Sequence, residues 1–81
     1  GDAAAEAARK PRANPASLRK LEADYAAAEA ELAALDAAMQ APEVACDAAR
    51  LAELQEQRDA LQLRADELLQ QYVTLLEEHP N

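Results

Sequence analysis

The residues of this sequence that could perform chemistry are mostly carboxylates. Sixteen Asp and Glu side chains are spread over 81 residues, against eight Lys and Arg, one His and one Cys. Acid–base catalysis by a pair of carboxylates needs a cleft that shifts the pKa of one of them. A chain this short and this rich in helix-forming residues offers no such cleft. We therefore interpret the acidic side chains as solvated helix faces.

The other reactive side chains stand alone in the sequence. Cys46 has no second cysteine with which to form an intramolecular disulfide, and His79 has no neighbours at metal-ligand spacing. The one glycine is residue 1, so the sequence contains no glycine-rich phosphate loop. We predict no catalytic residue, no metal site and no cofactor in this chain, and conclude that it is not an enzyme by itself.

The basic residues are unevenly distributed. The formal net charge of −8 opposes binding to a phosphate backbone. The first 20 residues are nevertheless positive, with five basic side chains against two acidic ones. We predict that any contact with nucleic acid uses these five residues. They are Arg9, Lys10, Arg12, Arg19 and Lys20.

The elements that must position these side chains are helices. The sequence is rich in Ala, Leu and Glu and lacks Phe and Trp, a composition that favours helix over sheet. Residues 1–13 contain the first three basic residues and Pro11 but no apolar periodicity. We predict a basic flexible linker over 1–13 and a single folded unit over 14–81.

Prolines and one aspartate mark the ends of two helices. Proline is tolerated at the first position of a helix, so Pro15 indicates a helix start. Pro42 lacks a backbone N–H and ends that helix shortly before it. Asp47 is a suitable N-cap for a second helix. We predict helices over about 15–40 and 47–79, joined by a short connection.

Apolar residues in both predicted helices recur at alternating intervals of three and four, which is the a/d seam of a coiled coil. Since the connection is short, the helices should be antiparallel neighbours. The predicted fold is all-α, a two-helix antiparallel coiled-coil hairpin. The seam of the first helix comprises Leu18, Leu21, Tyr25, Ala28, Leu32, Leu35 and Met39. The seam of the second comprises Leu51, Leu54, Arg58, Leu61, Ala65, Leu68, Tyr72 and Leu75.

Folding the chain about the connection gives an expected register. It places Leu18 beside Tyr72, and it sets large residues against small ones where Ala28 meets Leu61 and Tyr25 meets Ala65. Tyr25 and Tyr72 are then core residues with hydroxyl groups that reach water.

Arg58 occupies a seam position where a leucine would be usual, and the expected register places it opposite Leu32. Its stem should pack in the seam while the guanidinium reaches a carboxylate of Glu29, Glu31 or Asp36. Alternatively, Arg58 fixes the register or contacts a partner, as polar seam residues can.

Two leucines near the end of the second helix, Leu69 and Leu76, lie beside the seam rather than in it. They either widen the apolar stripe to cover Leu18 and the linker or form a patch that docks another domain or a second hairpin. We hypothesise a weak homodimer through these two residues.

The sequence contains neither an apolar run long enough to cross a bilayer nor a secretory signal peptide. We expect a cytoplasmic location and no membrane partner.

Four segments resemble parts of one protein family. Segment 9–12 (Arg-Lys-Pro-Arg) is similar to a basic linker, and segment 18–22 (Leu-Arg-Lys-Leu-Glu) is similar to the start of a helical hairpin. Segment 41–45 (Ala-Pro-Glu-Val-Ala) is similar to a loop that often begins with Asp, and 72–78 resembles a terminal Trp or Tyr followed by Leu-Glu-Glu. In this order, these features resemble the C-terminal domain of ABC-F ATPases of the Uup/YheS-like type.

The resemblance covers residues 9–79 and carries implications for function. It implies a parent protein that hydrolyses ATP with magnesium and engages ribosomal RNA or other nucleic acid. It also implies that this domain is a non-catalytic accessory arm next to the parent's own ATPase cassettes, whose motifs are absent from this sequence. The alternative is a structural coiled coil for self-association or protein docking.

Overall fold

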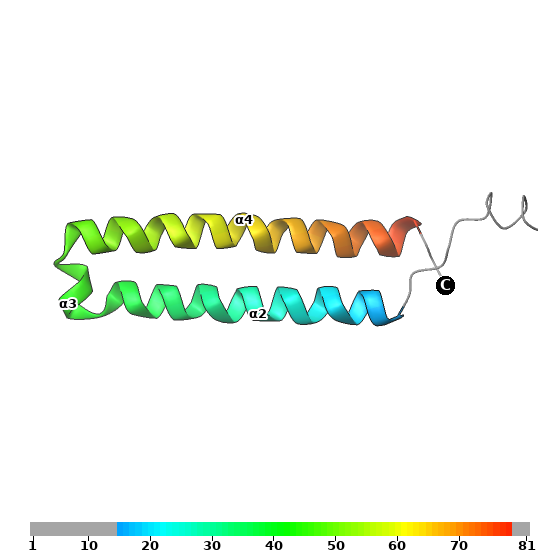
Figure 1. Cartoon of the computed structure of the whole chain (residues 1–81), viewed down its shortest axis with the longest axis horizontal. Coiled ribbons are helices and arrows are strands. Elements are labelled where there is room, and N and C mark those ends of the chain that lie inside the picture. Colours follow the sequence, from blue (N-terminus) through cyan, green and yellow to red (C-terminus); the bar gives the residue numbers. More distant parts are fainter. Residues whose placement is uncertain (1–14, 79–81) are drawn as a thin grey trace, which may run out of the picture.

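The computed structural model describes residues 15–78, so the expected linker and the last predicted helical residue, His79, lie outside the described part. Two long helices lie side by side and run in opposite directions (Figure 1). This arrangement confirms the predicted antiparallel hairpin. The elements are α2 (Pro15–Gln40), α3 (Pro42–Ala45) and α4 (Ala48–Glu78).

The hairpin is an elongated arm with two different ends. The 31 residues of α4 extend over roughly 46 Å at 1.5 Å per residue, and the 26 residues of α2 over roughly 39 Å. Pro15 and Glu78 lie at one end, called the root here, and α3 lies at the other, called the tip (Figure 1).

Asp47 is the N-cap of α4, as the sequence predicted. Its Oδ1 accepts a hydrogen bond of 3.0 Å from the backbone N–H of Arg50. Its carbonyl accepts the first helical bond, of 2.9 Å, from Leu51. A cap of this kind typically contributes about 1 kcal/mol. The helix itself begins at Ala48, one residue after the expected start.

The connection contains a helical turn that was not expected. Ala41 has an extended backbone (φ −62°, ψ 133°), as the residue before a proline favours, and α3 follows at once. Cys46 closes the turn, because its backbone N–H and its Sγ both donate to the carbonyl of Pro42, at 3.4 and 3.0 Å. Helix α3 contacts both long helices and lies beside the first turn of α4 (Figure 1).

The core follows the predicted seam closely. Every seam residue named above is buried or half-buried in the structure. The most buried side chains are Ala28, Leu32, Leu54, Ala65 and Leu68. All of these except Leu54 form one cluster, against which Leu21, Tyr25 and Leu61 pack. The spacing of two helices depends on the side chains between them, so the two alanines of this cluster allow a close approach at mid-length.

The register differs from the expected one by one helical turn. Tyr72, expected beside Leu18, donates a hydrogen bond of 2.9 Å from its hydroxyl to Oε1 of Glu22. Arg58 binds Asp36, which also lies one turn nearer the tip than the residue expected opposite it. The same displacement at two places indicates a shift of the whole of α4.

Helix α3 gives the physical reason for this displacement. Its four residues advance the chain by about 6 Å along the hairpin before the chain turns back. Helix α4 therefore begins beside α3 instead of beside the end of α2. Each later residue of α4 then lies one turn nearer the tip than a plain loop would place it.

Candidate interaction surfaces

Within residues 15–78, no group of three or more His, Cys, Asp or Glu is placed to hold a metal ion. None of the described helices combines the length and the apolar character that crossing a bilayer requires. The surface of the described hairpin instead presents charged side chains and exposed aliphatic ones.

Two of the five predicted nucleic-acid contacts, Arg19 and Lys20, lie on α2 near the root. Lys20 Nζ is 3.1 Å from Oδ2 of Asp24, but the lysine side chain is 76% exposed. Arg19 is exposed and has no ion pair among residues 15–78. Because an exposed ion pair contributes little, both cations remain available to a phosphate group. The other three, Arg9, Lys10 and Arg12, lie outside the described residues.

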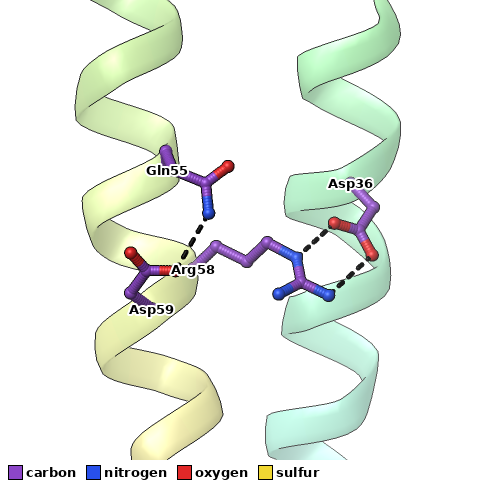
Figure 2. Close-up of polar contacts among 4 residues, drawn as sticks. All are labelled: Asp36, Gln55, Arg58 and Asp59. Carbon is purple, nitrogen blue, oxygen red and sulfur yellow. Dashed lines mark hydrogen bonds and ion pairs between the residues drawn. The ribbon is translucent and has the colours of Figure 1, made fainter.

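Arg58 joins the two helices (Figure 2). Its Nε donates to Oδ1 of Asp36, and its Nη2 donates to Oδ2 of the same carboxylate at 3.5 Å. This carboxylate is one of the three predicted acceptors. The hydrogen bond to Asp36, together with its charge, raises the pKa of Arg58 above its ordinary value. The guanidinium is thus engaged within the hairpin.

The two tyrosines also meet carboxylates at the edge of the seam. The hydrogen bond to Glu22, followed by the charge of that carboxylate, raises the pKa of Tyr72. The charge of Glu29 is the main cause that raises the pKa of Tyr25, with burial second and a smaller contribution from Asp66. Three carboxylates therefore lie around the two phenol groups.

A stripe of exposed aliphatic side chains runs along α4 near the root. Leu69, Val73 and Leu76 are 46%, 37% and 43% exposed. Their spacing of four and three residues places them on one face of the helix, which we call the α4 flank. Leu69 and Leu76 were predicted from the sequence, whereas Val73 was not, although the same spacing identifies it. Leu63 is 61% exposed and lies off this stripe.

A shallow groove of about 340 Å³, called the flank groove here, lies between the helices next to this stripe. It is lined by Leu21, Glu22, Tyr25, Leu68, Leu69 and Tyr72. Because Leu69 belongs to both, the groove and the stripe form one continuous apolar surface.

A larger open groove, of about 600 Å³, lies nearer the tip. Ala34 and Ala60 line it together with Leu35 and Leu61, and we call it the alanine groove.

Comparisons with known proteins identify no relative. A scan against protein-family models finds no match, and searches of curated proteins and of solved structures find none either. Proposals about function therefore depend on the sequence features and on the surfaces of the hairpin.

We expect the phenol of Tyr72 to titrate above its ordinary pKa of 10.0. The neutral phenol donates to Glu22, whereas the phenolate would be repelled by that carboxylate. Because the folded-state pKa is raised, this contribution to stability is complete below the unfolded pKa and is lost as pH rises through the folded pKa. Tyrosinate absorbance of a Tyr25→Phe chain, in which Tyr72 is the only tyrosine, should show a higher midpoint when folded than in urea. Equal midpoints would contradict the contact.

Proposed function

We propose that this chain is a non-catalytic C-terminal accessory arm of an ABC-F ATP-binding protein and contributes to ribosome or other nucleic-acid binding. The observation that carries the proposal is the antiparallel hairpin, whose two long helices have their outer ends together at the root (Figure 1). An arm of this kind is attached at one end and extends from its parent. ATP and magnesium belong, in this proposal, to the parent's own cassettes.

The distribution of charge favours the root as the nucleic-acid contact. The Debye length is about 8 Å at physiological ionic strength. The tip lies some tens of Å from the root, at 1.5 Å per residue along α2, so the acidic residues near the tip are screened at the root, while Glu77 and Glu78 at the end of α4 lie at the root itself. Arg19 and Lys20 lie at the root, and the chain that holds the other three basic residues joins the hairpin at Pro15.

A salt titration with a labelled short RNA tests this contact. We expect micromolar or weaker affinity, with a log–log salt slope of about −0.7 for each phosphate neutralised. Replacing Arg9, Lys10 and Arg12 by Ala should weaken binding and flatten the slope, because fewer counterions are then released.

Two single variants that change the net charge equally provide the matched control. Arg19→Ala should weaken RNA binding, whereas Arg50→Ala, in the first turn of α4 near the tip, should change it much less. Fluorescence anisotropy measures both variants, with circular dichroism to verify folding. Equal losses in the two variants, or no binding by the unmodified chain at low salt, would refute a contact at the root.

Whether this chain is part of an ABC-F protein can be tested without measuring RNA affinity. The reading frame that precedes residue 1 should encode two ATP-binding cassettes. A different upstream domain would remove the ABC-F assignment and leave the properties of the root to be judged by the RNA titration alone.

The α4 flank favours a second function, docking to a protein. Three aliphatic side chains that are each more than a third exposed, on one face and next to an apolar groove, are typical of a contact surface. This function does not exclude the first, since the two use different residues.

A further inference from the structure

The flank groove combines an apolar floor with a negative rim. Leu21 and Leu68 belong to the floor, and Leu69 connects the groove with the rest of the α4 flank. Glu22 lines the groove and receives the hydroxyl of Tyr72. An apolar surface with carboxylates around it selects its occupant by charge as well as by shape.

The carboxylates of this rim lack cationic partners within residues 15–78. Glu29 and Asp66 lie close enough to Tyr25, which lines the groove, to act electrostatically on its hydroxyl. Among the described residues, neither they nor Glu22 forms an ion pair with Lys or Arg. Lys20, the lysine of α2, forms its exposed ion pair with Asp24 and with none of these three carboxylates. A partner that brings positive charge would therefore meet carboxylates that are not already neutralised.

We propose that the α4 flank and the flank groove bind a cationic amphipathic helix of a partner protein. Its aliphatic side chains would lie against Leu69, Val73 and the groove, and its lysines or arginines would lie between the rim carboxylates. Leu69 and Leu76 are seven residues apart and therefore lie about 11 Å from each other along α4. Two turns of a facing helix have the same length. This inference does not depend on nucleic-acid binding, because it uses neither Arg19 nor Lys20.

A second copy of this chain fits the surface less well. The chain carries a net charge of −8, and two copies paired through the α4 flank would bring their acidic rims together. Like charges placed opposite each other at an interface oppose association. The exposed area of three aliphatic residues is also small beside the roughly 800 Å² per partner of a standard stable interface. A basic helix would add charge attraction to the rim carboxylates, and this attraction contributes affinity that the small apolar area does not supply.

The probe for the experiment is a labelled peptide of about four helical turns, with Leu at i, i+4 and i+7 on one face and Lys elsewhere. Fluorescence anisotropy with the full chain measures its affinity. We expect saturable binding that weakens with salt, and much weaker binding of a peptide of the same composition in scrambled order. A peptide with Glu in place of Lys should not bind.

The protein variants locate the binding surface. Leu69→Gln with Val73→Gln should weaken binding of the amphipathic peptide by about tenfold or more, because the lost apolar contacts are worth at least one decade of affinity. Leu63→Gln removes an aliphatic side chain that is more exposed than either, and should change affinity less than about twofold. Circular dichroism establishes that both variants remain folded.

Three outcomes would overturn the proposal. The first is equal binding of the scrambled peptide, which would show attraction to charge alone. The second is an equal loss in the Leu63→Gln variant, which would place binding elsewhere. The third is sedimentation of the unmodified chain as a dimer that Leu69→Gln with Val73→Gln converts to a monomer, which would make a second copy the occupant.

Discussion

Replacing Leu68 by alanine should lower the free energy of unfolding by about 2–4 kcal/mol. The Leu68 side chain is 3% exposed and belongs to the main core cluster with Ala28, Leu32 and Ala65. Removal of a buried leucine costs the transfer free energy of the lost atoms and leaves a cavity. Two of the other three buried residues of this cluster, Ala28 and Ala65, are alanines. Their short side chains cannot move to fill the space.

The loss would be large compared with the stability of the hairpin. A domain of this size buries only a thin core, so its total stability is expected to be a few kcal/mol. Urea denaturation followed by far-UV circular dichroism should therefore find much of the Leu68→Ala chain unfolded without denaturant. Leu63→Ala, at a side chain that is 61% exposed, should stay within about 0.5 kcal/mol of the unmodified chain. Equal losses in the two variants would mean that the cluster does not hold the helices together.

Reversal of one charge between the helices is the second large effect that we expect. Arg58→Glu replaces the cation that binds Asp36 by a carboxylate, so an attractive contact becomes a repulsive one. The two side chains are only 30% and 45% exposed, so water screens this change less than at a free surface. Arg64→Glu makes the same charge change at a residue with no ion pair among residues 15–78, and should cost clearly less.

The swapped pair tests the register directly. Arg58→Glu combined with Asp36→Arg restores the attraction with its direction reversed, and should recover most of the stability that Arg58→Glu loses. The melting temperatures of the unmodified chain, of Arg58→Glu, of Asp36→Arg and of the swapped variant complete a double-mutant cycle. If the swap recovers nothing, Arg58 and Asp36 are not neighbours in solution and the register observed here is not the one that the chain adopts.

The helices, their caps and the composition of the core could be predicted from the sequence because each has a local cause. The three-four spacing of apolar residues identifies the seam, and every residue assigned to it is buried or half-buried. Pro15 and Pro42 limit α2, and the Asp47 side chain caps α4. The exposed Leu69 and Leu76 were predicted from the same spacing, since they fall just outside the seam.

The register could not be predicted from this pattern. Displacement of α4 by one turn moves each seam residue to another seam level, so the apolar pattern fits both registers nearly equally well. The decision depends on the single turn of α3, which is held by hydrogen bonds to the carbonyls of Ala41 and Pro42 within the connection 41–47. Arg58 did not decide between the registers either, because Asp36 was one of three carboxylates expected within reach of its guanidinium, and the structure selects Asp36.

The two residue pairs whose hydrogen bonds join the long helices lie on the same side of the hairpin. Glu22 and Asp36 are two heptads apart on α2, and their partners Tyr72 and Arg58 are two heptads apart on α4. Among residues 15–78 no such bond closes the side that carries the alanine groove. The bonded side should therefore act as a hinge between the two helices. Bending or twisting of the arm should separate the helices on the opposite side and widen the alanine groove first.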